Sequence, residues 1–336
     1  MDWGIIAQRL AGKEILMMPD NSPLKMLVCY YDSLGIPYTE DGIMFPIQAG
    51  KAVSDTDLHI QGDNELDGHP CDNISGKNPS YSELTALYWT WKNLKKLYPD
   101  VKYVGWTHYR RFFAFDERRI LRDIISKPAS AIKDYRVNAA KVTRILEAGK
   151  IILAKKVCLG LPIDLHYWRC HHGKDYRTLK RIIKEKFPDY YDSFIRIMEL
   201  NNKISLYCMF VMKYEDFENY CGWLFSVLSE AEKEVPYQNY SPYQKRVFAF
   251  MAERLLNVYV AKNNLKPEYF NVYLYDNSKE DRKITERLEE FPIRLLSCCF
   301  WRLVGVSILC FRSLRGMFKK GQGTKKFPLK PQEEQS

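Results

Sequence analysis

A histidine and two arginines directly follow an apolar stretch about one third of the way along the chain. The stretch covers residues 101–106, and His108, Tyr109, Arg110 and Arg111 come next. Its β-branched and aromatic residues predict a buried strand. Ligands of open α/β sheets bind beyond the carboxyl ends of strands. Two guanidiniums there suit a phosphate or diphosphate, because each presents paired donors to phosphate oxygens. The alternative is a solvated basic turn.

A polar loop and a helix precede this strand. The loop, residues 62–79, is rich in Asp, Asn, Gly and Pro and offers many acceptors and backbone donors. Ser80 and Glu83 have the spacing of a capping box, and apolar residues recur at helical spacing from residue 84 to 94. The helix would end near Pro99. Its N-terminus, which favours an anion, would then face the basic strand end.

Side chains of this loop have competing interpretations. Asp72 and Asn73 form either an Asx turn or contacts to a ligand. Lys77 lies beside the predicted helix N-terminus. Glu83 serves either as a helix cap or as part of a site.

The rest of the chain alternates between strand and helix patterns, which is typical of an α/β protein. Pro46 places one of the strands at an edge or at a strand end. Residues 204–212 are apolar without alternation, as in a strand covered on both faces. Strands are expected over residues 26–31, 43–47, 150–154 and 204–212. Helices are expected over residues 116–125, 138–148, 175–187, 189–200 and 214–228, and from 241 onward. Residues 5–10 and 14–18 would form a short helix and a strand.

One arginine falls on the apolar face of the last of these helices. Arg254 lies seven residues after Val247, in the middle of that face. A charge there needs a partner, because an unpaired buried charge is costly. The partner is either a carboxylate or a bound anion.

Histidine and cysteine side chains gather in residues 166–175. This segment holds His166, Cys170, His171, His172 and Asp175. The spacing matches no common zinc pattern, so a polar loop or surface is favoured over a metal site.

The charge is concentrated at the C-terminal end. Residues 292–336 carry nine Lys and Arg against two Glu, which is +7 of the net charge of +10. The nearly neutral remainder argues against a nucleic-acid binder, which more often has a basic stripe on its folded domain. Nine scattered cysteines without a CxxC pair argue for a reducing compartment. The N-terminus lacks the pattern of a signal peptide, so a cytosolic start is expected.

The segment from residue 293 to 318 is apolar but interrupted by arginines. Its uninterrupted pieces are shorter than the about 20 residues that a membrane span needs. We expect a helix lying in the interface of an anionic membrane, with the arginines reaching lipid phosphates. The alternative is a helix that packs on the domain or on a second subunit.

Five stretches, taken in order, resemble one family. They are CYY…FPIQAGKA from residue 29, DNISGKNPSYSELTALYWTWKN from 72, YVGWTHYRRFF from 103, YCMFVMKYEDF from 207 and YQKRVFAFMAERLLNVY from 243. The family comprises bacterial capsular and exopolysaccharide glycosyltransferases long filed as a domain of unknown function (DUF4422-like), and some members resemble galactofuranosyltransferases. The resemblance covers roughly residues 25–262 and is specific, because several motifs recur in one order.

The resemblance implies a fold and an activity. The fold would be α/β, a single Rossmann-type domain of the GT-A kind with a mixed sheet. The activity would be transfer of a hexosyl group, with galactofuranosyl among the candidates, from a nucleotide-sugar donor to a lipid-linked oligosaccharide acceptor in capsule or exopolysaccharide synthesis. The transferase domain would cover residues 25–290, between an N-terminal extension at 1–24 and a basic amphipathic helical tail at 291–336.

The same resemblance implies a cytoplasmic protein, peripheral on the inner face of the plasma membrane through its tail. A non-catalytic nucleotide- or carbohydrate-binding module with a membrane-associated tail is the alternative, because fold alone does not imply catalysis.

The resemblance also transfers roles to single residues. The candidates for the catalytic base are His108, Asp72 and Glu253. One position departs from the pattern, because Cys208 stands where the family usually has Asn, and a sugar contact there would change the substrate preference. Substrate binding would fall to Asn73, Lys77, Asn78, Glu83, Tyr109, Arg110, Arg111, Cys208, Arg246 and Arg254.

Many GT-A enzymes end the corresponding strand in Asp-x-Asp, which holds a divalent metal on the diphosphate. Here the strand ends in His108, Tyr109 and Arg110, and two arginines can supply the same electrostatic stabilisation. The expectation is therefore no required metal. Asp72 and other loop carboxylates leave Mg²⁺ or Mn²⁺ open, because hard cations need only oxygen ligands and water.

Overall fold

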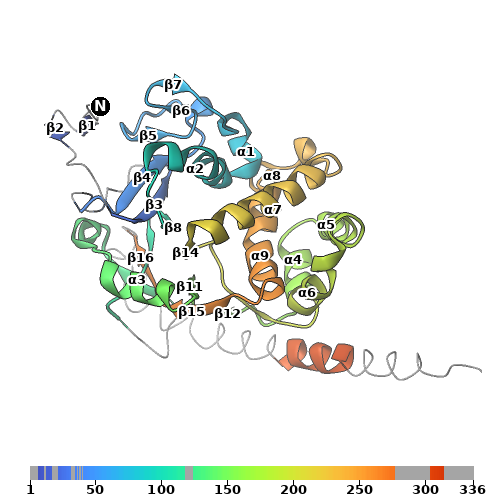
Figure 1. Cartoon of the computed structure of the whole chain (residues 1–336). Helices are drawn as coiled ribbons and strands as arrows, with labels where there is room; N and C mark the ends of the chain where they lie inside the picture. The colour runs from blue at the N-terminus through green and yellow to red at the C-terminus, as the bar shows by residue number, and fades with distance from the viewer. Residues whose placement is uncertain are drawn as a thin grey trace, which may run out of the picture.

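The structure is a computed structural model that describes residues 7–10, 13–16, 22–31, 35, 37, 39, 41–117, 124–276 and 303–313. Most of the expected N-terminal extension and C-terminal tail lies outside the described residues. Figure 1 shows a central sheet with helices packed around it.

Seven strands form the main part of the sheet, in the spatial order β5-β4-β3-β8-β14-β11-β15. β14 is antiparallel to both of its neighbours, and the other pairs are parallel. The strand order reverses between β3 and β8, and ligands of open α/β sheets bind beyond the carboxyl ends of the strands at such a switch point. The bounds are β3 Leu24–Tyr30, β4 Met44–Gln48, β5 Gln61–Gly62, β8 Tyr103–His108, β11 Lys150–Ala154, β14 Phe210–Lys213 and β15 Lys266–Phe270.

A second branch of the sheet leaves from the end of β8. A tight turn at Tyr109 and Arg110 leads into β9 (Arg111–Phe113), which pairs with β16 (Val272–Tyr275). β16 in turn pairs with β10 (Ile124–Lys127). Three small antiparallel pairs complete the described strands: β1 Ala7–Leu10 with β2 Lys13–Leu16, β6 Glu65–Leu66 with β7 His69–Pro70, and β12 Val157–Cys158 with β13 Lys203–Ile204.

Both faces of the sheet are covered, as the alternation along β3 shows. Leu27 and Cys29 pack into a core with α2, α7 and α9, whereas Met26 and Val28 pack into a second core with α3. Successive side chains along a β-strand point to opposite faces of the sheet. The helices are α1 Asn78–Tyr81, α2 Leu84–Leu97, α3 Ala139–Glu147, α4 Ile163–Cys170, α5 Gly173–Lys186, α6 Pro188–Met198, α7 Tyr214–Glu232, α8 Pro242–Lys245 and α9 Val247–Lys262, and residues 303–313 form one more.

The predicted strands at 26–31, 43–47 and 150–154 and the predicted helices at 138–148, 175–187, 189–200 and 214–228 are confirmed within a few residues. Pro46 lies in β4 opposite Val28, and β5 pairs only from Ile47 onward. The proline therefore lies where the outer pairing has not yet begun, which suits a residue without an N–H.

The predicted capping box is wrong. Ser80 lies inside the short helix α1, and its hydroxyl donates to the carbonyl of Lys77. Glu83 is the N-cap residue of α2, but its side chain makes no capping hydrogen bond. α1 begins at Asn78, with Pro79 as its second residue, and the longer helix begins at Leu84, seven residues after Lys77.

Two other expected elements differ. The strand predicted over residues 204–212 is interrupted, because Tyr207 and Cys208 both have positive φ, of 71° and 52°. The helix predicted over residues 116–125 is wrong at its end, where Ile124 and Ile125 belong to β10. Residues 7–10 form a strand rather than the expected helix, and this strand pairs in a hairpin with β2, which confirms the expected second strand over its described residues.

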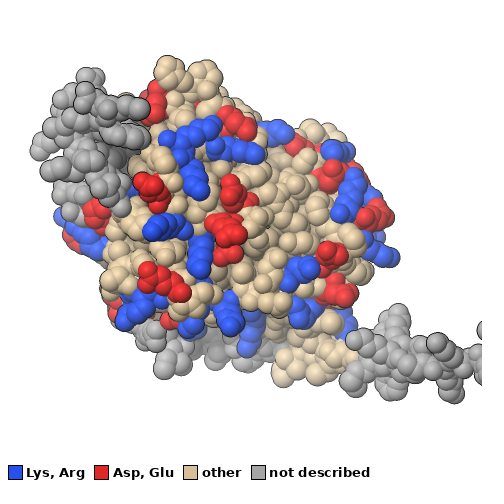
Figure 2. Space-filling view, viewed as in Figure 1, with Lys and Arg blue, Asp and Glu red and all other residues tan. Residues whose placement is uncertain are grey.

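The surface in view carries no block of one charge. Figure 2 shows Lys and Arg interleaved with Asp and Glu over this face, which agrees with a nearly neutral body. Among the described helices, none has the length and apolarity that crossing a bilayer requires.

Candidate functional site

Five ionisable side chains meet beyond the carboxyl end of β8, and we call them the charged cluster: Glu83, His108, Arg111, Arg246 and Glu253. They come from the start of α2, the end of β8, the start of β9, the N-cap of α9 and, for Glu253, the middle of α9. Glu83 interacts electrostatically with Arg246, Glu253 and Arg111, and His108 interacts with Arg111, Glu253 and Arg246. The cluster lies at the switch point between β3 and β8, where open α/β sheets bind ligands.

One backbone unit is clamped between two members of the cluster. The carboxylate of Glu253 accepts from the Tyr207 N–H at 2.9 Å, and His108 Nε2 lies 2.5 Å from the Tyr207 carbonyl oxygen. The guanidinium of Arg111 lies over the Tyr207 ring, 4.6 Å from its centroid. These contacts hold Tyr207 and Cys208 in the left-handed region, which non-glycine residues rarely adopt.

A second strained residue borders the cluster on the α2 side. Ser82 has φ 49° and ψ −129°. Its carbonyl accepts from Asn78 Nδ2 at 2.9 Å, and its hydroxyl accepts from Arg246 Nε at 2.8 Å. Strained backbone of this kind is held only where surrounding contacts over-determine it, and it concentrates at functional sites.

Asn78 holds this corner by packing as well as by hydrogen bonding. Gly50 faces it with φ 67°, and a Cβ at Gly50 would lie 2.4 Å from Asn78 Cγ. Only glycine therefore allows the β4 loop to approach Asn78. The structure gives Asn78 a positioning role at the cluster.

Asp63 is a further organising residue that the sequence reasoning did not single out. Its fully buried carboxylate accepts from the N–H groups of Gly50 and Lys51 and from the Ser75 hydroxyl. It thereby ties the β4 loop to the polar loop before α1. The sequence contains only a weak indication of this role, because nothing distinguishes a buried Asp from the exposed Asp residues of the same polar loop.

His108 is buried, and burial lowers its pKa to about 4. The ring is therefore neutral at pH 7. A carbonyl oxygen only accepts, so Nε2 carries the hydrogen towards Tyr207 and the lone pair lies on Nδ1. Among the described residues, none bonds to Nδ1.

Glu83 has the least constrained carboxylate of the cluster. Its pKa is raised, chiefly by burial, and the side chain keeps one fifth of its surface exposed. The Arg246 guanidinium lies 3.8 Å away. Both oxygens of Glu253, in contrast, are bonded, one to the Tyr207 N–H and the other to Arg254.

The two arginines of the β8–β9 turn diverge. Arg111 faces the cluster, whereas Arg110 lies against the Tyr109 ring, 5.4 Å from its centroid. The Tyr109 hydroxyl lies 3.0 Å from that of Tyr31, and burial raises the pKa of Tyr109 to about 12. Within the described part of the chain, neither guanidinium makes a hydrogen bond or ion pair, and the Nε of Arg110 is buried without a partner.

Arg254 is buried as its pattern predicts, with 4% of its side chain exposed. Its partner is the carboxylate of Glu253 at 2.8 Å, so the internal ion pair is the alternative that the structure shows. Its Nε is nevertheless buried without a partner among the described residues. The guanidinium lies over the Tyr167 ring, 5.4 Å from its centroid.

Three residues of the polar loop do not reach the charged cluster in their described contacts. Asp72 accepts a hydrogen bond from the Tyr88 hydroxyl. Tyr88 lies five residues after Glu83 on α2, which is about 8 Å along the helix axis. Asn73 forms a turn by accepting from the Ser75 N–H. Lys77 forms an ion pair with Glu232 of α7 at 2.8 Å.

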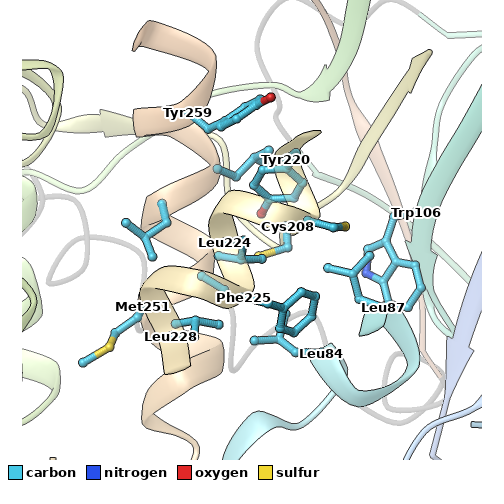
Figure 3. Packing of buried hydrophobic residues seen from close by; sticks show 14 of the residues in the cluster. Leu84, Leu87, Trp106, Cys208, Tyr220, Leu224, Phe225, Leu228, Met251 and Tyr259 are labelled. Carbon is cyan, nitrogen blue, oxygen red and sulfur yellow. The ribbon is translucent and has the colours of Figure 1, made fainter. Parts of the chain in front are cut away.

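Cys208 does not line the site either. Its side chain is fully buried, and burial raises the pKa of its thiol well above the ordinary value. Figure 3 shows it in the core near Leu224 and Trp106. In this structure the thiol has no exposed surface through which to contact a sugar, and the expected sugar contact stays a prediction.

Metal binding finds no support in the donor groups at the end of β8. That strand end offers an imidazole and two guanidiniums rather than paired carboxylates, so these residues do not fit a divalent cation. Within the described residues, including those of the segment 166–175, no three His, Cys, Asp or Glu side chains form a group that could hold a metal ion.

Comparison with known proteins gives two findings. The sequence profile of the family described as "Domain of unknown function (DUF4422)" matches residues 25–264. A solved structure of WbbM, described as a bifunctional glycosyltransferase in its apo form, is similar with a TM-score of 0.65 and 30% sequence identity over 76% of this chain. The matched part spans 45% of that protein. No curated protein matches at a significant level.

Proposed function

The chain belongs to the DUF4422 family, and we propose that it is a glycosyltransferase that moves a hexosyl group from a nucleotide sugar to a glycan acceptor. The observation that carries the proposal is the charged cluster at the switch point, where Arg111 has no hydrogen bond or ion pair among the described residues and Glu83 has a carboxylate of raised pKa. The similarity to WbbM, which is described as a glycosyltransferase, supports the same activity.

The strand order supports assignment to the GT-A class. Numbered along the chain, the seven main strands lie in the order 3-2-1-4-6-5-7, with the sixth reversed. A nucleotide is expected over the ends of β3 and β8, because dinucleotide and nucleotide ligands of such sheets sit at the switch point.

The diphosphate of the donor is assigned to the guanidiniums next to this point. Arg111 and Arg246 both belong to the charged cluster, and Arg110 lies one residue away on the other side of the turn. Fixed guanidiniums stabilise the charge that develops on a leaving diphosphate. No step in this proposal requires a metal.

Glu83 is the base that the geometry favours for a transfer with inversion. It takes the proton of the acceptor hydroxyl, whose oxygen forms a bond to the anomeric carbon of the sugar. The bond from that carbon to the diphosphate breaks, and the electron pair leaves with the diphosphate. A raised pKa brings Glu83 closer to the operating pH, which suits a general base.

The three base candidates from sequence are less suited in this geometry. Both carboxylate oxygens of Glu253 are bonded, and His108 uses Nε2 to hold Tyr207. Asp72 is bonded to Tyr88 along α2. In this proposal His108 and Glu253 are positioning residues.

The acceptor is proposed to be a lipid-linked oligosaccharide of capsule or exopolysaccharide synthesis, with a galactofuranosyl group among the candidate sugars. The helix at residues 303–313 supports contact with an anionic membrane surface. Arg312 holds this helix on the body through both oxygens of Asp164, at 2.9 and 3.0 Å. Its other side exposes Leu303, Val306 and Phe311 by 71%, 52% and 65%.

This helix combines the two alternatives for the tail, because one side packs on the domain and the other remains available to lipid. Replacing Leu303, Val306 and Phe311 together by Ser should reduce co-sedimentation with vesicles that contain one-third phosphatidylglycerol. The control is Leu200→Ser, another exposed apolar side chain (42%). Equal sedimentation of both variants would contradict the membrane assignment.

The function itself is tested by incubating the full chain with nucleotide sugars in the absence of acceptor. Slow release of the nucleoside diphosphate above the spontaneous rate, lost in Glu83→Gln, is the expected result. Thermal stabilisation by a nucleotide sugar without any turnover, with or without glycan acceptors, would instead indicate the non-catalytic binding module.

A further inference from the structure

Three rings form a stack directly beside the charged cluster, and we call them the ring stack: His171, Tyr243 and Phe250. The centroids of His171 and Phe250 lie 3.9 Å apart at 22°, and those of Tyr243 and Phe250 lie 5.3 Å apart. Tyr243 is 58% exposed, which is unusual for a large ring in contact with two others. The stack joins the cluster through Arg246, whose guanidinium lies 5.9 Å from the Phe250 centroid.

The stack also carries a defined hydrogen-bonding edge. Gln244 donates its amide N–H to the Cys170 carbonyl at 2.9 Å, so its Oε1 faces His171 Nδ1, 3.3 Å away. Nδ1 must therefore carry the hydrogen, and the lone pair lies on Nε2. Among the described residues, none bonds to this Nε2.

The imidazole is held neutral by its surroundings. Burial lowers the pKa of His171 to about 4, and the buried guanidinium of Arg254 acts in the same direction. Arg254 and His171 both contact the Tyr167 ring, whose centroid is 4.9 Å from that of His171. A neutral ring presents an apolar face and one acceptor rather than a charge.

We propose that the ring stack is the subsite for a saccharide unit of the acceptor. The exposed Tyr243 ring offers an apolar face to the C–H face of a sugar, because burying both removes apolar surface from water. His171 Nε2 accepts from one sugar hydroxyl. Arg246 contacts the stack and also lies 3.8 Å from Glu83. A second hydroxyl of the sugar bound at the stack would therefore lie close to Glu83. This inference rests on the proposed transferase function and names its acceptor class.

Ring–sugar contact has a direct test in ligand-observed NMR. The full chain is mixed with methyl glycosides of galactose, glucose, mannose and N-acetylglucosamine, and saturation transfer to each sugar is measured. At least one glycoside should receive saturation, and Tyr243→Ala should lower the signal at least fivefold. Tyr243→Phe should retain it, because the ring rather than the hydroxyl makes the contact.

The matched control is Tyr269→Ala on the edge strand β15. Tyr269 is 38% exposed, and its described ring contact is with Lys156, away from the stack. His171→Phe is a second variant that keeps a ring in the stack but removes the acceptor, and it should also lower the signal. Equal signals from Tyr243→Ala and Tyr269→Ala, or no saturation of any glycoside, would overturn the proposal.

Thermal shift with uridine diphosphate separates this proposal from the transferase function. Glycoside binding at the stack without any nucleotide binding would remove the transferase assignment and leave a saccharide site. Nucleotide binding and donor hydrolysis without glycoside binding would contradict the saccharide subsite at the ring stack but would leave the proposed transferase function in place.

Discussion

Basic side chains have carboxylate partners in one region of this molecule and lack them in another. On the surface formed by α5, α6 and α7, basic side chains have carboxylate partners: Lys180 with Glu199, Arg181 with Glu185 and Glu234, and Lys186 with Glu230. At the β8–β9 turn, Arg110 and Arg111 have no carboxylate partner among the described residues, although Glu83 and Glu253 lie close to Arg111.

The backbone differs between the two places in the same sense. The three paired cations, Lys180, Arg181 and Lys186, all lie on the regular helix α5. Around the cluster, Ser82, Tyr207 and Cys208 all have positive φ. Exposed ion pairs contribute only about 0–1 kcal/mol each to folding stability, so the pairs on the helices have little effect on stability. Unpaired guanidiniums and strained backbone at one point are instead what a ligand-binding site requires.

The largest effect should come from the cluster carboxylate that the proposal makes the base. Glu83→Gln keeps the shape but removes the proton acceptor, so turnover should fall 10²- to 10⁴-fold. The matched variant on the paired surface, Glu185→Gln, should leave turnover unchanged. Measurement of kcat for both with a functional donor checks the contrast, and similar rates for the two would remove Glu83 from the chemistry.

Acid should destabilise the protein through the site rather than through the paired surface. Burial holds the pKa of His108 at about 4 in the fold, against 6.5 when unfolded, so only the unfolded chain takes up this proton between those values. The contribution of His108 to stability is therefore full above pH 6.5 and is lost as pH drops towards 4, by about 3 kcal/mol, and His166 and His171, whose pKa burial also lowers to about 4, add to the loss.

Urea unfolding at pH 7 and pH 4 measures this loss. His108→Ala should lose less stability than the parent over that range, since it lacks the titrating ring. An equal loss in both proteins would show that other groups carry the acid sensitivity.

The third effect is on positioning. His108→Ala removes the donor to the Tyr207 carbonyl, which should loosen the left-handed turn and lower turnover by about tenfold. Circular dichroism and the melting temperature check that the fold persists. An unchanged kcat in a folded variant would leave His108 with a structural role alone.

The smallest effect is expected on the paired surface itself. Arg181→Ala breaks contacts with Glu185 and Glu234, both at the exterior. Stability should change by less than about 1 kcal/mol and nucleotide affinity should not change. Loss of nucleotide binding in Arg181→Ala would contradict the proposed difference between the paired surface and the β8–β9 turn.

The sequence was informative where local pattern decides structure. Apolar runs predicted β3, β4 and β11, and helical spacing predicted α2, α5, α6 and α7. The basic turn after β8 and the buried Arg254 were also recognised from residue type and spacing.

Long-range contacts explain what the pattern missed. Residues 204–212 look like one strand, but His108 and Glu253, 99 and 46 residues from Tyr207, impose a left-handed turn. The capping box failed because Arg246, 164 residues from Ser82, fixes that corner instead. No local signal distinguishes Glu83 as a site carboxylate from Glu83 as a cap.

The central claim is that the unpaired guanidiniums of the β8–β9 turn bind the donor diphosphate. Its most direct test is calorimetric titration of uridine diphosphate into the parent chain, Arg110→Ala, Arg111→Ala and Arg181→Ala. Loss of a charge-assisted hydrogen bond predicts at least about tenfold weaker binding, about 1.4 kcal/mol, for each turn variant. Arg181→Ala should bind as the parent does. Parent-like affinity in both turn variants would contradict the claim.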